Sequence, residues 1–142
     1  MPALMHNISA ISRCAAAYRQ EELAPLGLKA IHASYLITLC RNPGMTQEQL
    51  AKRVFVNKSN AARQVAVLEE AGFVTRSPSE EDKRAMLVYP TEKAYEALPK
   101  IRQTFRDWEA LAAQDLTEEE RQLLITMLSK MRDRAAQWME EH

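Results

Sequence analysis

Two short helical patterns joined by a three-residue break constrain the fold of this chain more than any other feature of its sequence. Residues 47–54 and 58–71 repeat apolar side chains at three- and four-residue steps, as amphipathic helices do. Thr46 and Gln49 have the spacing of a capping box before the first helix, and Asn57 is placed to cap the second. Two helices of this size joined by a tight turn predict a helix-turn-helix.

After Gly72 the pattern changes from helical to extended. Residues 73–76 and 85–89 are rich in β-forming side chains, and the polar, turn-rich stretch 77–84 separates them. These runs predict a β-hairpin with a long tip. A helix-turn-helix followed by a hairpin is a winged helix, so the expected fold class is mainly α with a two-stranded β wing.

Helical patterns also lie on both sides of the expected winged helix. Residues 7–22 form the first of them, with Asn7 as its cap, and residues 28–41 form a second, more apolar one. Residues 91–113 form a long fifth helix, in which Pro99 is expected to produce a kink. The chain is therefore expected to be helical nearly everywhere outside the hairpin.

The last helix has more apolar surface than one copy of the chain can cover. Thr117 and Glu120 form a capping box at its start. Its apolar residues spread too widely for a helix that only faces solvent; they are Leu123, Leu124, Met127, Leu128, Met131, Ala135, Trp138 and Met139. The first helix has a similar surplus. We therefore expect a single domain over residues 1–142, with a winged helix at about 28–90 and dimerisation helices at 7–22 and 91–140.

Composition excludes several classes of protein. Hydrophobic residues make up 46% and charged residues 27% of the 142 positions, which is close to a soluble globular average and unlike a disordered chain. No apolar run reaches the roughly 18–20 residues of a membrane span, and no secretion signal opens the sequence. We therefore expect a cytoplasmic protein with no membrane association.

Catalytic and cofactor-binding signatures are also missing from the sequence. Its two cysteines and three histidines have no metal-binding spacing, and no glycine-rich phosphate loop occurs. Neither a Ser-His-Asp order nor a paired-carboxylate site stands out. We expect no metal, no cofactor and no enzymatic activity.

The net charge is zero, but the charge is unevenly distributed. Residues 52–76 carry a net charge of +3, from five basic side chains (Lys52, Arg53, Lys58, Arg63 and Arg76) against two acidic ones (Glu69 and Glu70). A local basic stretch in a neutral chain indicates an anionic partner. On charge alone, a solvated helix face explains the same pattern equally well.

Three short motifs follow one another in a fixed order along the chain. They are Gly-Met-Thr-Gln-Glu-Gln-Leu-Ala at 44–51, Val-Leu-Glu-Glu-Ala-Gly-Phe-Val-Thr-Arg at 67–76 and Asp-Lys-Arg at 82–84. Their order and spacing resemble the MarR family of bacterial transcription regulators over residues 7–140. The resemblance implies an obligate homodimer in which each winged helix binds one half of a pseudo-palindromic double-stranded DNA operator. It also implies, for many members, release of DNA by a small aromatic or phenolic acid or by cysteine oxidation.

The chain departs from the pattern of that family at two places. Lys29 and His32 stand where the family usually has threonine and glutamine, and Pro-Thr-Glu-Lys-Ala at 90–94 replaces a Leu-Thr-x-x-Gly run. Neither place belongs to the elements expected to read DNA.

The second helix of the expected helix-turn-helix offers side chains suited to DNA. Arginine and lysine favour guanine, asparagine and glutamine favour adenine, and serine bonds to either. Its N-terminal turn and outer face present Lys58, Ser59, Asn60, Arg63 and Gln64. The alternatives are a face that only keeps the helix soluble, and a role for Ser59 or Asn60 only in capping.

The wing is expected to make the remaining DNA contacts. By resemblance, Arg84 enters the minor groove with Lys83 beside it, and Asp82 holds the wing by pairing with a nearby arginine. Arg76 is expected to contact phosphate or to pair with Asp82. The predicted function is a sequence-specific DNA-binding regulator, a repressor released by a small molecule, with half-sites about 10–10.5 base pairs apart.

The sequence leaves the effector open. Tyr18, His32 and Tyr35 are placed to line a pocket for a small aromatic or phenolic anion, although core packing explains them as well. Cys14, one turn before Tyr18, resembles the reactive cysteine of the organic-peroxide-sensing branch of the family, and a buried, inert Cys14 is the alternative. A winged helix that binds another protein is an alternative function, and it would predict an apolar face around Arg63.

Overall fold

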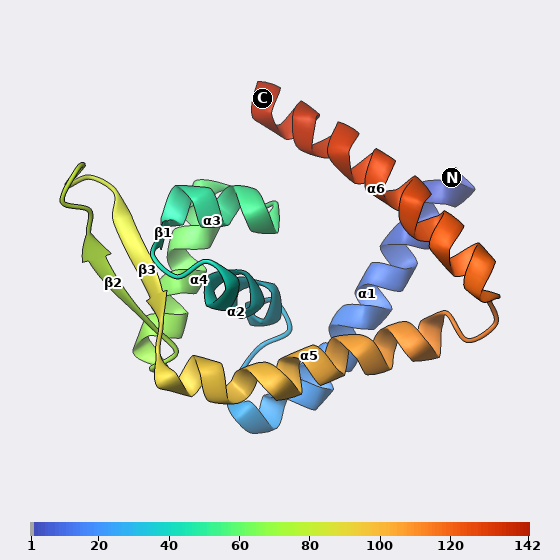
Figure 1. Ribbon diagram of the computed structural model, residues 1–142, viewed down its shortest axis with the longest axis horizontal. Helices are drawn as coiled ribbons and strands as arrows, with labels where there is room; N and C mark the ends of the chain where they lie inside the picture. The colour runs from blue at the N-terminus through green and yellow to red at the C-terminus, as the bar shows by residue number, and fades with distance from the viewer. Residues whose placement is uncertain (1) are drawn as a thin grey trace. The chain divides into compact units, whose positions relative to one another are not determined.

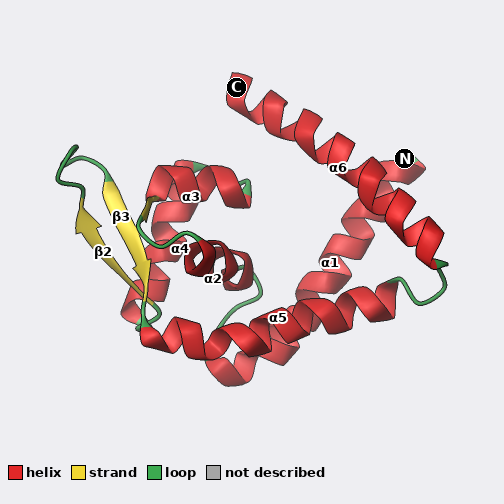
Figure 2. Ribbon diagram, in the orientation of Figure 1, coloured by secondary structure: helices red, strands yellow, loops and turns green. Residues whose placement is uncertain are grey.

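Six α-helices and three short strands make up the part of the chain that the structure, a computed structural model, describes: residues 2–142 (Figures 1 and 2). The chain divides into two units, one that ends at Arg106 and one that runs from Asp107 to His142. The expected winged helix lies within the first unit. A single domain over the whole chain stays a prediction.

The helices follow the sequence patterns closely in the middle of the chain and less closely before it. The first unit contains α1 (Ala3–Leu23), a 3-10 turn (Ala24–Leu26), α2 (His32–Arg41), α3 (Gln47–Val54), α4 (Lys58–Glu70) and most of α5 (Glu92–Ala112). The two helices of the helix-turn-helix are therefore confirmed. Pro99 lies inside α5, and the kink expected there stays a prediction.

The predicted starts of the first two helices are wrong. Helix α1 begins at Ala3, so Asn7 lies inside it and does not cap it, because the residues from Ala3 to Met5 are themselves strong helix formers. Helix α2 begins at His32 and not at residue 28. The backbone N–H of Lys29 donates to Nδ1 of the His32 imidazole at 3.1 Å, and this bond helps to hold the preceding residues in turns.

The sheet contains the predicted hairpin and one strand more. Strands β2 (Val74–Pro78) and β3 (Met86–Pro90) pair antiparallel, and β1 (Met45–Thr46) pairs with the other edge of β3, in the order β1-β3-β2. In Figure 1 the hairpin extends away from α3 and α4. The two residues of β1 are too few to produce an alternating pattern, so the sequence predicts two strands and the structure has three.

The core of the first unit lies between α2, α3, α4, the sheet and α5. Its members have almost no exposed surface, and the largest are Tyr35, Phe73, Leu23, Leu28, Leu36, Leu39, Leu50, Leu68 and Ile101. Burying a side chain of this size contributes about 1.5–3 kcal/mol. This core fixes α3, α4 and the wing relative to one another.

Gly44 is the point at which the chain turns from α2 into the sheet. Its φ is +84°, a left-handed conformation, and a Cβ atom there would lie 3.0 Å from the Tyr89 ring. Gly27 also has a positive φ, of +75°, but a Cβ atom on it would meet nothing within 4 Å. A substitution at Gly27 therefore tests the backbone conformation alone, and one at Gly44 tests the conformation together with the contact to Tyr89.

Gly44→Ala is expected to destabilise the protein more than Gly27→Ala. The left-handed conformation alone costs a residue with a Cβ about 1–2 kcal/mol, and at Gly44 the Tyr89 ring must move as well. Urea unfolding of the two variants measures the difference in the free energy of unfolding. Equal losses would contradict a role for the Tyr89 contact.

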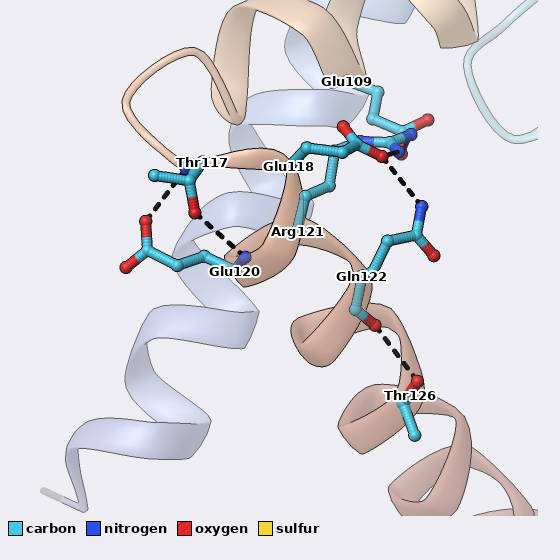
Figure 3. A network of polar contacts seen from close by, with 7 residues as sticks. All are labelled: Glu109, Thr117, Glu118, Glu120, Arg121, Gln122 and Thr126. Carbon is cyan, nitrogen blue, oxygen red and sulfur yellow. Dashed lines mark hydrogen bonds and ion pairs between the residues drawn. The ribbon is translucent and has the colours of Figure 1, made fainter.

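The second unit is dominated by α6 (Glu118–Glu141). The predicted capping box is confirmed: Thr117 Oγ1 accepts from the Glu120 N–H at 3.1 Å, and Glu120 Oε1 accepts from the Thr117 N–H at 2.9 Å (Figure 3). Arg121 donates to Glu109 at 2.6 Å and lies 3.7 Å from Glu118. These bonds connect the end of α5 to the first turn of α6.

Helix α6 buries none of its side chains in this chain. Its large exposed apolar residues are Leu123, Leu124, Ile125, Met127, Leu128, Trp138 and Met139. Helix α1 likewise leaves Leu4, Met5 and Ile11 exposed. Apolar patches of this extent mark surfaces that bind another protein.

Candidate nucleic-acid interface

Helix α4 is capped by the residue before it, which leaves its first side chains for other partners. Asn57 Oδ1 accepts from the backbone N–H of Asn60 at 2.8 Å. The alternative that Ser59 or Asn60 serves only as the helix cap is therefore wrong. Ser59 is exposed and Asn60 is half-buried.

Two cations project from the same helix. Arg63 is exposed, and Lys58 forms an ion pair with Glu48 of α3 at 3.1 Å. The side chains of Lys58 and Glu48 are 75% and 57% exposed, so water screens the pair and it contributes little stability. A phosphate can therefore replace Glu48 as the partner of Lys58 at small cost.

Gln64 is hydrogen-bonded to a buried side chain of α2. It is half-buried, and its Oε1 lies 3.0 Å from Nε2 of His32, which is only 2% exposed. The structure thus brings together a residue predicted to read DNA and a residue predicted to line an effector pocket. The sequence contained no signal for this pair, because the two residues are 32 positions apart.

Arg76 connects three elements of the winged helix. From β2, its Nε and Nη2 donate to Glu69 Oε1 at 3.3 and 3.0 Å, and its Nη1 donates to Gln47 Oε1 at 3.0 Å. The expected pairing of Arg76 with Asp82 is wrong, because Glu69 and Gln47 lie within reach of the guanidinium from the end of α4 and the start of α3. Contact of Arg76 with phosphate stays a prediction.

The wing tip is held by short-range bonds. Asp82 Oδ1 accepts from the backbone N–H of Arg84 at 3.0 Å and lies 3.6 Å from Arg84 Nε, so the nearby arginine that Asp82 contacts is Arg84. Ser79 Oγ accepts from the N–H groups of Glu81 and Asp82. Lys83 is exposed and the Arg84 side chain is 95% exposed, so both can reach a ligand outside the fold.

His32 and Glu69, both in the winged helix, have pKa values below their usual ones. Burial lowers the pKa of His32, and the charge of Lys29 lowers it further, although the hydrogen bond to Gln64 acts in the opposite direction. The hydrogen bonds from Arg76 lower the pKa of Glu69. In both cases the unfolded chain binds a proton at a higher pH than the folded chain does.

Stability is expected to fall in two separate steps on acidification. The contribution of His32 is complete above about pH 6.5 and is lost as the pH falls toward its lower pKa in the folded state. The contribution of Glu69 is complete above about pH 4.3 and is lost in the same direction. Urea unfolding across this range tests both steps. His32→Gln should remove the first and keep the second, and a wild-type stability unchanged between about pH 7 and 5 would contradict the first.

A surface cavity of about 500 Å³ lies between α1 and the residues around the start of α2, but the predicted effector residues do not line it. Its walls are Ala16, Arg19, Gln20, Lys29, Ala30, Ile31 and Ser34. Tyr35 and His32 are buried in the core, as the alternative of core packing predicts for them. Tyr18 is half-buried. Sequence reasoning missed Arg19, whose buried Nε lacks a hydrogen bond and whose guanidinium lies 4.7 Å from the Phe105 ring centre.

The two cysteines differ in their surroundings. Cys14 is exposed, so the alternative of a buried Cys14 is wrong. Cys40 is half-buried, and burial raises the pKa of its thiol. A thiol that faces solvent is accessible to an oxidant.

Among residues 2–142 no group of three or more His, Cys, Asp or Glu side chains is arranged to hold a metal ion. No helix in the same range combines the length and the hydropathy needed to cross a membrane.

Comparison with known proteins agrees with this geometry. Residues 26–85 match the MarR family. The chain is 30% identical over 129 residues to the HTH-type transcriptional regulator YybA of Bacillus subtilis, covering 91% of this chain and 86% of that protein. The crystal structure of the transcriptional regulator SlyA superimposes with a TM-score of 0.92 at 30% identity, covering 97% of both chains.

A third similar protein was solved together with DNA. It is a MarR-family transcriptional regulator from Listeria monocytogenes in complex with a 26mer DNA, with a TM-score of 0.89, 27% identity and coverage of 96% of this chain and 91% of that one. The expected winged-helix fold is confirmed by these matches. This chain, with its capped helix-turn-helix, its wing and its regulator relatives, belongs to the MarR family of transcriptional regulators.

Proposed function

We propose that the protein is a homodimeric, cytoplasmic repressor that binds a pseudo-palindromic double-stranded DNA operator. The observation that carries this proposal is the set of exposed cations on the reading helix and the wing: Lys58, Arg63, Lys83 and Arg84. Such side chains bind phosphates and guanine edges. The DNA complex of the Listeria relative supports the same use of the fold, and a charged face around Arg63 argues against a protein-interaction module.

The apolar surface of α6 supports the homodimer. A helix of 24 residues with no buried side chain and seven large exposed apolar ones leaves a surface that water hydrates poorly. A second copy presents the same surface, so the two can cover each other in a two-fold arrangement. Two-fold symmetry in the protein then matches an inverted repeat in the operator.

The cavity between α1 and the residues around the start of α2 supports a small-molecule effector. Arg19 and Lys29 supply positive charge, while Ala16, Ala30 and Ile31 supply apolar wall. This combination suits a small aromatic or phenolic acid, whose carboxylate or phenolate meets the cations and whose ring meets the apolar side. We propose that an anion of this kind releases the DNA.

Because Cys14 is exposed, release of the DNA by oxidation of its thiol is a second candidate mechanism. Peroxide should then dissociate the complex of the wild-type protein with DNA and leave that of Cys14→Ser intact. Equal behaviour of the two proteins would remove this candidate.

Selection from a randomised duplex of about 30 base pairs, followed by sequencing of the bound fraction, tests the main proposal. Fluorescence anisotropy at two salt concentrations measures the affinity alongside it. An enriched inverted repeat is the expected result. Weak, salt-sensitive binding without an enriched motif would contradict sequence-specific recognition and favour the protein-interaction module.

A further inference from the structure

A hydrogen bond between the buried His32 and the half-buried Gln64 joins the start of α2 to helix α4. His32, which is 2% exposed, uses both ring nitrogens: Nδ1 faces the backbone N–H of Lys29 at 3.1 Å, and Nε2 faces Oε1 of Gln64 at 3.0 Å. Leaving a buried polar group without a hydrogen bond destabilises the fold. Conformations in which both ring nitrogens of His32 are bonded are therefore favoured over those in which either is not.

The chemistry of the imidazole fixes the direction of each bond. A backbone N–H can only donate, so Nδ1 of His32 must accept and carries no proton. In the neutral ring the proton is then on Nε2, which donates to Gln64. Gln64 must therefore present its oxygen, Oε1, to His32. The burial that lowers the pKa of His32 favours this neutral form.

The orientation of Gln64 decides what it can offer to DNA. Its oxygen is engaged inside the fold, whereas its amide nitrogen has no hydrogen bond to another of the described residues. Recognition of adenine by glutamine needs both groups, the oxygen to accept from N6 and the nitrogen to donate to N7. The carbonyl oxygen has two lone pairs, so Oε1 can accept from His32 and still accept from a base, while the NH₂ group is free to donate.

We propose that His32 is a positioning residue for DNA recognition: it holds the Gln64 carboxamide so that its NH₂ group donates to an acceptor on the base edge. The acceptors of this kind in the major groove are O6 and N7 of guanine, N7 of adenine and O4 of thymine. This inference rests on the proposed DNA-binding function. It assigns to a buried residue outside α4 a part in setting the base preference of α4.

Two substitutions of His32 test the hydrogen bonds of its two ring nitrogens separately. In His32→Gln the amide nitrogen lies near the position of Nε2 and can still donate to Gln64. In His32→Asn the shorter side chain reaches only the position of Nδ1, so it can bond to the Lys29 N–H but not to Gln64. Gln64→Leu removes the carboxamide itself and marks the operator position that Gln64 reads.

The experiment is selection from the randomised duplex with the wild type, the three single variants and the His32→Asn/Gln64→Leu double variant. Discrimination at one operator position should fall by about 5-fold or more in Gln64→Leu and at the same position in His32→Asn. The double variant should lose no more than either of these, and His32→Gln should keep the wild-type preference. Circular dichroism and thermal unfolding report whether each variant folds.

Several results would overturn the inference. One is a His32→Asn profile that keeps the preference lost in Gln64→Leu, or that weakens every position equally. Another is a base preference of His32→Gln that changes as much as that of His32→Asn. A third is unfolding of both His32 variants, which would mean that His32 only stabilises the fold. If Gln64→Leu changes no base preference, Gln64 does not read DNA and the inference fails. A wild-type protein that enriches no inverted repeat is a different failure, because it rejects the proposed function itself.

Discussion

Replacement of Leu124 and Leu128 by glutamate should convert the protein from a dimer to a monomer and abolish tight operator binding. The two residues lie one turn apart on α6, and both are exposed in the single chain. Burying four such side chains per dimer contributes about 6 kcal/mol or more, and the glutamates add the cost of burying charge. Without the partner each winged helix binds its half-site alone, so operator affinity should fall by about 100-fold or more.

Analytical ultracentrifugation measures the oligomeric state, and anisotropy with the selected operator measures the affinity. Thr126→Glu is the matched control, because Thr126 is exposed and lies on the opposite side of α6 from Leu124 and Leu128. It adds a charge of the same sign to the same helix and should leave the dimer intact. A double glutamate variant that sediments as a dimer would refute the proposed interface.

Arg84→Ala should weaken binding to the operator and to random DNA by a similar factor and flatten the salt dependence. The Arg84 side chain is 95% exposed at the wing tip, and its 3.6 Å contact with Asp82 leaves it able to reach the DNA. Each neutralised phosphate contributes about −0.9 to the slope of log affinity against log salt, so a dimer that loses two contacts should lose about 1.8 from its slope. Anisotropy titrations across a salt series give this slope directly.

Arg63→Ala is the matched comparison, since it removes the same charge from α4 instead of the wing. Its expected effect is a relaxed preference at particular operator positions, worth about 1–3 kcal/mol per base contact. Operator and random DNA should therefore lose affinity unequally. An Arg84→Ala slope equal to that of the wild type, or equal losses on both DNAs in Arg63→Ala, would contradict the assigned roles.

The sequence predicted those parts of the fold that local chemistry determines. The capping boxes at Thr46 and Thr117 appear where the spacing indicated them, and so does the cap at Asn57. Each depends on residues three positions apart. The start of α1 was mispredicted because a polar residue, Asn7, looked like a cap although the helix formers before it extend the helix.

Contacts between distant segments could not be predicted in the same way. The sequence suggests phosphate or the nearby Asp82 as the partner of Arg76, but its partners within the fold come from the ends of two helices. The bond between His32 and Gln64 likewise depends on how α2 packs on α4. The cavity beside Arg19 depends on how the residues around the start of α2 lie against α1. The types of residue at the candidate site were therefore predictable, and their pairings were not.

Thr46 serves two structures at once, since it pairs with Leu87 in the sheet and caps α3 through Gln49. Opening of the β1–β3 ladder therefore removes the residue that satisfies the first turn of α3, and fraying of α3 releases an edge of the sheet. The wing and the helix-turn-helix should consequently open as one cooperative unit. Amide hydrogen exchange would then give the N–H of Gln49 and the N–H groups of β3 the same opening free energy, so that the whole DNA-binding face is either assembled or lost together.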